Sequence, residues 1–217
     1  MAEARRTYDD KLAQILRASA AIFAEKGYHE ASIREISRAT GVSLAGLYYY
    51  FSSKEELLFL IQDHCFTTLN ENLDRLLEQE KEPPRRFRLM VENHLRFFVN
   101  NMKEMKVLSH ELHSLTGEFR ETVNATKRRY TDTCRGILQA VAPVGSPIDA
   151  RVAVYALFGM MNWIYNWYRP ERDVPVAKLA DDISQLFLRG YLSGAAGALQ
   201  EWASAVSIEP SPSIWRT

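Results

Sequence analysis

Cysteine is scarce in this chain. Cys65 and Cys134 are its two cysteines, and they lie far apart, without the CxxC or Cys/His spacing of a redox or zinc site. We therefore expect reduced, packed thiols rather than a disulfide. A run of about 18 apolar residues and a basic-then-apolar N-terminal leader are also missing. These absences predict a cytoplasmic protein with neither a membrane span nor a signal peptide.

An excess of charge is absent as well, because 27 basic residues balance 27 acidic residues. This balance excludes a protein that binds polyanions without specificity. Residues 1–54 contain eight bases and six acids, so the local basic excess is two. No repeat is present, and no segment alternates apolar and polar residues in the manner of a half-buried strand. The sequence therefore predicts an all-α protein.

The segment 32–56 has the start signals of two helices around a tight turn. Ser32 precedes Glu35, and Ser53 precedes Glu56, with the Ser-x-x-Glu spacing of a capping box. Gly41 can adopt the positive φ of a helix end, and Ser43 can cap the next helix. The apolar residues spaced to face one small core are Ile33, Ile36, Val42, Leu47 and Phe51. This pattern predicts a DNA-binding helix-turn-helix.

The helix predicted over 44–50 is the one expected to enter the major groove. Leu44 and Ala45 suit contact with thymine methyl groups, and Gly46 allows a close approach of the backbone. Arg34 is the candidate for a guanine contact. The remaining contacts are expected with phosphates, through the side chains of Tyr48, Tyr49, Tyr50 and Lys54 and through backbone N–H groups near Ser32 and Ser43.

The run Gly-Val-Ser-Leu-Ala-Gly-Leu-Tyr-Tyr-Tyr-Phe-Ser-Ser-Lys-Glu-Glu-Leu, residues 41–57, resembles the DNA-binding signature of TetR-family transcriptional regulators. The resemblance covers roughly Tyr8 to Leu60. The chain departs from the commonest pattern at Ser37 and Thr40, where alanine is usual, and at Leu44, where a polar residue is frequent. Membership would imply that double-stranded operator DNA, a small hydrophobic effector and a second copy of the chain are partners.

The predicted organisation has two domains, and 217 residues with 47% hydrophobic content suffice for the cores of both. A three-helix DNA-binding domain is expected over 1–53, with residues 1–7 as an arm, and a helical effector-binding and dimerisation domain over 54–200. Residues 201–217 are expected to be a mobile tail. The predicted helices run from near Tyr8 to Lys26, from after Ser53 to about Glu80, from Pro84 to about Asn101, from about Lys103 to Leu115, from Glu118 to Val141, from Ile148 to Tyr168 and from Val176 to about Leu199.

The predicted helix 148–168 is apolar nearly all round, so it needs cover on both sides. We expect the effector domain to cover one side and a partner subunit the other, with the final helix completing a four-helix interface. An effector cavity should combine apolar side chains with a few polar groups. Its expected lining is Met105, Leu108, Leu112, His113, Tyr130, Phe158, Met161, Asn162 and Trp163.

Within the family, residues 161–170 resemble the Trp-Tyr-x-Pro stretch of regulators of fatty-acid and sterol catabolism that respond to acyl-coenzyme A thioesters. This resemblance implies a repressor that an acyl-coenzyme A releases from its operator. The candidates for binding the coenzyme phosphates are Arg120, Lys127, Arg128, Arg129 and Arg169. Two alternatives are a regulator of drug efflux or of another small-molecule response, and a ligandless DNA-binding scaffold protein.

An enzyme is the least favoured interpretation. The segment that comes closest to a metal-binding motif is His110-Glu111-Leu112-His113, but its histidines lie at i and i+3 rather than at i and i+4 as in HExxH. No nucleophile elbow or glycine-rich phosphate loop is present. The sequence therefore predicts no catalytic residues, no metal site and no cofactor.

Overall fold

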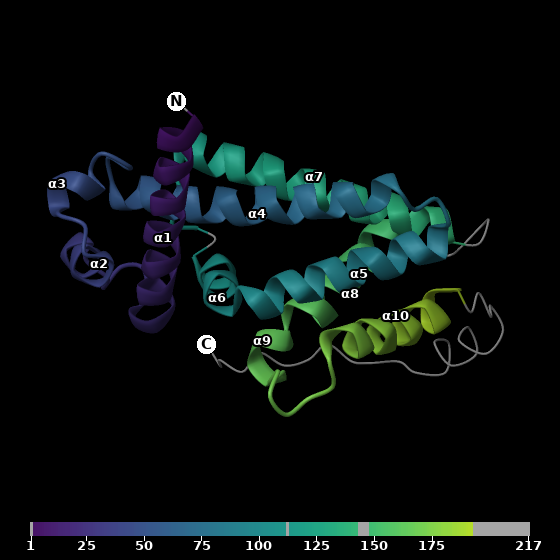
Figure 1. Cartoon of the computed structure of the whole chain (residues 1–217). Coiled ribbons are helices and arrows are strands. Elements are labelled where there is room, and N and C mark those ends of the chain that lie inside the picture. The colour runs from purple at the N-terminus through teal and green to yellow at the C-terminus, as the bar shows by residue number, and fades with distance from the viewer. Residues whose placement is uncertain (1, 112, 143–147, 193–217) are drawn as a thin grey trace, which may run out of the picture.

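The computed structural model describes residues 2–111, 113–142 and 148–192, and only the backbone of residues 2–7, 108–110 and 191. Within these residues the chain forms helices and no β-strand (Figure 1), as predicted. The helices are α1 (Ala2–Lys26), α2 (Ile33–Thr40), α3 (Leu44–Leu47), α4 (Lys54–Glu78), α5 (Pro83–Asn100), α6 (Met102–His110), α7 (Gly117–Val141), α8 (Ala150–Asn162), α9 (Ile164–Trp167) and α10 (Val176–Leu192).

Four helix boundaries differ from the sequence prediction. Helix α3 ends at Leu47, so residues 48–50 form a turn and do not complete the helix predicted over 44–50. Helix α1 begins at Ala2 instead of near Tyr8, so residues 2–7 extend the helix and are not the predicted arm. Helix α6 ends at His110, before the predicted end at Leu115. The predicted helix 148–168 is interrupted at Trp163, which separates α8 from α9. The predicted tail, 201–217, lies outside the described residues.

Side-chain caps fix the starts of the short helices. The box at α2 forms as predicted, because Glu35 N donates to Ser32 Oγ over 3.3 Å and Ser32 N donates to Glu35 Oε2 over 2.9 Å. The box predicted at α4 forms only in half. Ser53 Oγ accepts from Glu56 N, but the Glu56 carboxylate accepts from Ser52 N, over 2.6 Å, instead of Ser53 N.

Helices α2 and α3 lie at one end of the molecule, where α1 crosses the start of α4 (Figure 1). Gly41 has a φ of 66° and ends α2, and the Ser43 hydroxyl caps α3 by accepting from Gly46 N. Ile36, Leu47 and Phe51 are buried in the core that this end shares with α1 and α4. The sequence was right about this small apolar core.

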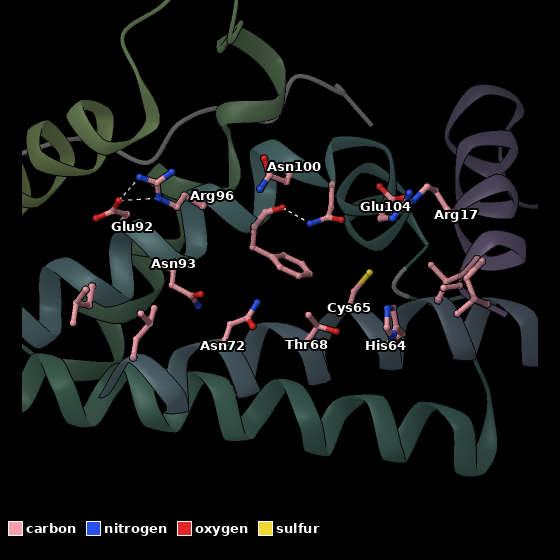
Figure 2. Close-up of a pocket in the computed structure, with 17 residues that line it drawn as sticks. Arg17, His64, Cys65, Thr68, Asn72, Glu92, Asn93, Arg96, Asn100 and Glu104 are labelled. Atoms are coloured by element: carbon pink, nitrogen blue, oxygen red, sulfur yellow. Dashed lines mark hydrogen bonds and ion pairs between the residues drawn. The ribbon is translucent and has the colours of Figure 1, made fainter. Parts of the chain in front are cut away.

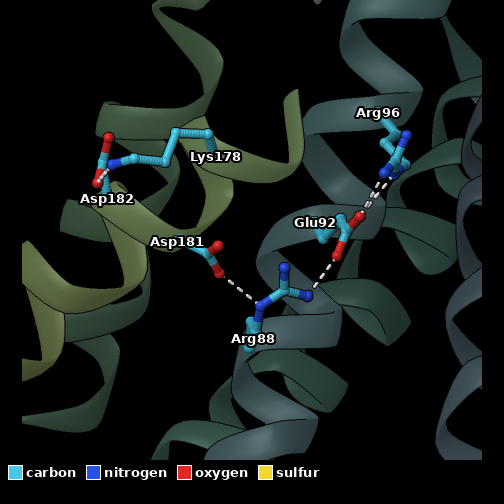
Figure 3. Close-up of polar contacts among 6 residues, drawn as sticks. All are labelled: Arg88, Glu92, Arg96, Lys178, Asp181 and Asp182. Atoms are coloured by element: carbon cyan, nitrogen blue, oxygen red, sulfur yellow. Dashed lines mark hydrogen bonds and ion pairs between the residues drawn. The ribbon is translucent and has the colours of Figure 1, made fainter. Parts of the chain in front are cut away.

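The larger part of the molecule is a helical bundle. Helix α4 packs along both α7 and α5, α7 packs on α8, and α10 packs on α5. Figure 3 shows the ion pairs at the last contact: Arg88 Nε lies 2.6 Å from Asp181 Oδ1 of α10, and Arg88 also pairs with Glu92, which pairs with Arg96. These side chains are partly exposed, so each pair contributes little alone. The Arg88–Asp181 pair joins α10 to α5, whereas the other two pairs lie within α5 and orient the Arg88 side chain.

Candidate DNA-binding surface and effector cavity

The surface around α3 is exposed and mixes apolar with aromatic side chains. Leu44 is 39% exposed, Tyr48 54% and Tyr49 74%. Ala45 and Arg34 are also exposed. In the described part of the chain the Arg34 guanidinium has no hydrogen-bond or ion-pair partner, so it is free to contact a base or a phosphate.

The three adjacent tyrosines differ in their surroundings. Tyr50 is half-buried and stacks on Tyr8 of α1, with 4.9 Å between ring centroids. Tyr49 meets both rings edge-on, at 5.9 Å from Tyr8 and 5.3 Å from Tyr50. Tyr48 and Tyr49 therefore expose more of their side chains than Tyr50, which packs the turn after α3 against α1.

Gly46 and Ser32 have structural roles in addition to the contacts with DNA that were predicted for them. A Cβ atom at Gly46 would lie 2.9 Å from Val42 Cγ1, so a larger residue would push α3 away from the turn. The Ser32 hydroxyl donates to Glu35 Oε2 over 3.0 Å. Glu35 also pairs with Lys26, and the hydrogen bond from Lys26, followed by those from Ser32, lowers the pKa of Glu35 to about 2. The start of α2 is thereby tied to the end of α1.

Lys54 has a different environment from the one expected for a phosphate contact. Its Nζ atom donates to the carbonyl oxygens of Tyr28, His29 and Ala31 over 3.0, 3.0 and 3.1 Å. It also lies 4.7 Å from the centre of the Tyr28 ring. All three N–H donors of the ammonium group are used, so we assign Lys54 to holding the α1–α2 loop against the start of α4.

Replacing Lys54 with methionine should lower the free energy of unfolding by about 1–3 kcal/mol, because three carbonyl groups lose a charged donor while the side-chain length is kept. Urea denaturation followed by circular dichroism measures the change. Lys103→Met, at an exposed position on α6, is the matched control and should change stability by less than about 0.5 kcal/mol. Equal stability of the two variants would contradict the assignment of Lys54.

A central cavity of about 600 Å³ opens between α4, α5, α7 and α8. Its lining is largely apolar and aromatic, with a few polar groups: Phe66, Leu69, His94, Phe98, Met105, Lys127, Tyr130, Thr131, Tyr155, Phe158, Gly159, Asn162, Trp163 and Tyr165. Met105, Tyr130, Phe158, Asn162 and Trp163 were among the predicted lining residues. This volume lies within the range of small-molecule sites.

Two predicted lining residues are elsewhere. Met161 is buried but does not line the cavity. Its neighbour Asn162 does, and consecutive residues of a helix point in directions about 100° apart. His113 is exposed in the loop after α6. Leu112 lies outside the described residues, and so does the side chain of Leu108.

A buried series of hydrogen bonds runs through the wall of the central cavity. Its middle residue is His94, which was not among the residues predicted to line the cavity. The His94 Nδ1 atom lies 3.0 Å from the Tyr130 hydroxyl, and Nε2 lies 2.9 Å from Asn162 Oδ1. Tyr130 therefore donates to Nδ1, and Nε2–H donates to the amide oxygen. Burial lowers the pKa of His94 to about 4, so the imidazole is neutral at pH 7.

This histidine predicts a pH-dependent stability. Its pKa is about 4 in the folded protein, and about 6.5 is expected when the chain is unfolded. The stabilisation is therefore complete above pH 6.5 and is lost as the pH falls from 6.5 toward 4, by about 3 kcal/mol in all. Urea unfolding of the wild type and of His94→Gln at pH 7.0 and 4.5 measures it. We expect the variant to lose less stability over this interval, and parallel losses would refute the prediction.

A basic groove of about 320 Å³ adjoins the central cavity on α7 and α8. The cavity and the groove share Lys127, Thr131 and Tyr155. The other residues of the groove are Asn124, Arg128, Asp132, Arg135, Arg151 and Val154. Burial lowers the pKa of Lys127 to about 8, so the amine is still mostly protonated at pH 7.

Three of the five basic residues expected to face coenzyme phosphates lie away from this groove. Arg129 pairs with Asp74 over 2.6 Å, and Arg169 donates to the carbonyl oxygens of Tyr168 and Asn166. Arg120 lines neither the cavity nor the groove. Lys127 and Arg128 remain, and the structure adds Arg135 and Arg151 to them.

Two family models match the chain, one over the N-terminal helices and one over the helical bundle. The model described as "Bacterial regulatory proteins, tetR family" matches residues 15–61, and the one described as "Tetracyclin repressor-like, C-terminal domain" matches residues 80–191, more than half of the 217 residues. The chain belongs to the TetR family. TetR-family proteins are DNA-binding regulators of transcription, and the first match contains the whole α2–α3 surface.

Relatives of known structure or function are similar over both domains. A TetR-family regulator from Bordetella parapertussis 12822 is 33% identical with a TM-score of 0.77, over 84% of this chain and 96% of that one. AibR, solved in complex with isovaleryl coenzyme A and operator DNA, is 27% identical with a TM-score of 0.72, over 81% and 97%. The fatty acid metabolism regulator protein of Bacillus subtilis (strain 168) is 22% identical over 184 residues, which are 83% of this chain and 95% of that protein.

Two features are missing from the described residues. No helix among them is long and apolar enough to cross a membrane. Their histidine, cysteine and acidic side chains form no group of three or more that could hold a metal ion.

Proposed function

We propose that this TetR-family regulator is a homodimeric repressor that an acyl-coenzyme A thioester releases from its operator. The observation that carries the proposal is the contact between an apolar cavity and a basic groove. Lys127, Thr131 and Tyr155 line both, so one ligand can fill both. An acyl-coenzyme A has the matching halves: an apolar chain and a nucleotide that carries several phosphate charges.

The charges of the basic groove favour a polyanion. Lys127, Arg128, Arg135 and Arg151 contribute four positive charges against the single negative charge of Asp132. Arg135 pairs with Asp132 over 2.8 Å and can exchange this exposed partner for a phosphate at little cost. Lys127 would gain most, because a phosphate would replace part of the solvation that burial has removed.

Two relatives support the same class of effector. AibR was crystallised with isovaleryl coenzyme A and operator DNA, and the Bacillus subtilis relative is a regulator of fatty acid metabolism. Both aligned regions extend over more than four-fifths of this chain. From these two relatives we infer the class of effector for this chain, an acyl-coenzyme A, but not the length of its acyl group.

A dimer surface is available on the last helices. Val152, Tyr155 and Trp163 are 63%, 54% and 61% exposed along one side of α8 and at its end. Leu186 of α10 is 68% exposed. Exposed apolar side chains of this number on two neighbouring helices favour a second copy of the chain as their cover. The dimer would present two α3 helices to two half-sites of the operator.

Contacts between the α6–α7 loop and the DNA-binding end offer a path from cavity to operator. Glu55 Oε1 of α4 accepts from the backbone N and the hydroxyl of Thr116 over 2.7 and 2.8 Å. Tyr28 N donates to Glu111 Oε1, and Gln62 Nε2 donates to Glu111 O. An effector that moves α6 through Met105 would disturb these bonds, and the coupling must work equally in both directions.

The decisive experiment titrates the protein with acyl-coenzyme A thioesters of four to sixteen carbons, free coenzyme A and free fatty acids. Trp163 lines the cavity and reports binding by fluorescence. An operator selected from a random DNA pool then reports release. We expect one range of thioesters to bind at least about tenfold more tightly than either half alone and to release the DNA. Equal binding of all three classes, or none, would reject the proposal and favour another hydrophobic inducer or the scaffold alternative.

A further inference from the structure

A second cavity lies where the two domains meet. This junction cavity has a volume of about 480 Å³ and is bounded by α1, α4, α5 and α6 (Figure 2). Its lining is Ala13, Leu16, Arg17, Ile61, His64, Cys65, Thr68, Asn72, Leu76, Leu89, Glu92, Asn93, Arg96, Phe97, Asn100, Asn101 and Glu104. It shares no residue with the central cavity.

The two cavities lie on opposite sides of the α4–α5 pair. Along α4, Cys65 and Thr68 line the junction cavity while Phe66 and Leu69 line the central one. Along α5, the same alternation occurs at Asn93 and His94 and at Phe97 and Phe98. The wall between the cavities is therefore one layer of helices, and the two sites are separate.

The charges of the junction cavity cancel. The lining contains two arginines, Arg17 and Arg96, and two glutamates, Glu92 and Glu104. Its formal charge is therefore zero when His64 is neutral. At one end, Arg96 Nη2 pairs with Glu92 Oε1 over 2.6 Å. Figure 2 shows Arg17 and Glu104 toward the other end. A phosphate or carboxylate would meet a glutamate at either end, and a cation would meet an arginine, so each would lose hydration without an unopposed partner.

Polar side chains that lack a partner in the described part of the chain border this space, and of these Arg17, His64 and Asn100 are also exposed to solvent while Thr68 is half-buried. Within the described residues, the side chains of Arg17, His64, Thr68 and Asn100 make no hydrogen bond, and Figure 2 shows Thr68 and Asn72 of α4 across from Asn93 of α5. Apolar walls complete the lining: Leu16, Ile61, Leu76, Leu89 and Phe97. A few convergent polar groups on an otherwise apolar surface are the composition of small-molecule sites.

We propose that the junction cavity is a second effector site, for an uncharged molecule that carries a ring and amide or hydroxyl groups. The Asn100 amide makes no hydrogen bond among the described residues. Asn72 keeps its Nδ2 donor while its Oδ1 accepts from Arg75, and Asn93 keeps its Oδ1 acceptor while its Nδ2 donates to Leu69 O. Together they offer both donors and acceptors, which match such groups. The ligand would touch α1 of the DNA-binding domain and α4, α5 and α6 of the effector domain at once. Its binding is therefore coupled to how these two domains are held.

Three probes of nearly equal shape test the charge preference: benzamide, benzoate and benzamidine. Ligand-observed saturation-transfer NMR on the full-length protein measures each. For a fragment of about nine non-hydrogen atoms we expect millimolar affinity for benzamide, and at least about fivefold weaker binding of the anion and the cation. Similar affinity for all three, or no benzamide binding, would overturn the proposal.

Two neighbouring threonines locate the site. Thr68→Phe fills the junction cavity and should abolish benzamide binding, whereas Thr67→Phe, one residue earlier at a half-buried position that lines neither cavity, should leave it unchanged. Asn72→Leu keeps the branching at Cγ, removes the amide and should weaken binding at least about threefold, which keeps the test valid if Thr68→Phe does not fold. Benzamide binding that survives both Thr68→Phe and Asn72→Leu would place the fragment elsewhere and refute the proposal.

A competition experiment separates this proposal from the acyl-coenzyme A effector. Acyl-coenzyme A beyond saturation should change the apparent affinity for benzamide only up to a fixed limit, because the two cavities share no residue and coupling between separate sites saturates. A benzamide dissociation constant that keeps rising in proportion to the thioester concentration would mean a single site and would overturn the second one. The benzamide result does not depend on which molecule fills the central cavity.

Discussion

Replacing Leu44 with glutamate should lower the affinity for operator DNA at least about 100-fold, while the protein stays folded. Leu44 is the first residue of α3 and is 39% exposed, so little packing is lost. An acidic residue in the first turn also interacts favourably with the helix dipole. On DNA, the carboxylate of this glutamate would enter the major groove, where the flanking phosphates repel its charge. Only a base edge with a hydrogen-bond donor could compensate for this repulsion. Fluorescence anisotropy with labelled operator measures the change.

Two control variants separate charge from shape. Leu44→Gln has the same length without the charge and should weaken binding by no more than about tenfold, the loss expected from one apolar contact with a thymine methyl group. Val174→Glu adds the same charge at an exposed position before α10 and should leave the affinity unchanged. If Leu44→Glu bound within about threefold of the wild type, α3 would not be the helix in the groove.

The DNA-binding end could be predicted almost completely from the sequence, because its signals are local. The capping residues, Gly41 and the apolar spacing act within a few positions of one another. The errors there are the arm predicted over 1–7, whose residues 2–7 are helical, and the partners of Glu56 and Lys54. Glu56 had two adjacent serines within reach, and it accepts from the backbone N and the hydroxyl of Ser52, the residue before the N-cap, rather than from the N-cap itself. Lys54 binds carbonyls that lie 23 to 26 positions earlier, a distance that no local pattern reveals.

The central cavity could be predicted only in part, since its polar members meet through the tertiary fold. His94 lies 36 positions from Tyr130 and 68 from Asn162, so no local pattern indicates that these three side chains meet. His113 was misplaced because α6 ends at His110, which leaves position 113 in a loop. Periodicity identified α8 as an apolar helix but could not determine which of Met161 and Asn162 faces the cavity.

Replacing Thr131 with tryptophan should weaken acyl-coenzyme A binding at least about 100-fold and leave operator binding intact. Thr131 is half-buried on α7 and lines both the central cavity and the basic groove, so an indole there closes the passage between them. A ligand held by only one of its halves loses the other half's contribution, and 100-fold corresponds to about 2.7 kcal/mol. The variant should therefore remain on its operator at thioester concentrations that release the wild type.

Thr122→Trp is the matched control, because Thr122 is exposed on the same helix and lines neither the cavity nor the groove. It should respond to the thioester like the wild type. The melting temperature of Thr131→Trp checks for overpacking, which can cost about 1–3 kcal/mol when a large side chain is forced into a packed site. Normal release of DNA from a folded Thr131→Trp variant would mean that the effector does not pass between the cavity and the groove. In that case the apolar cavity alone would bind it, as expected for an uncharged hydrophobic inducer.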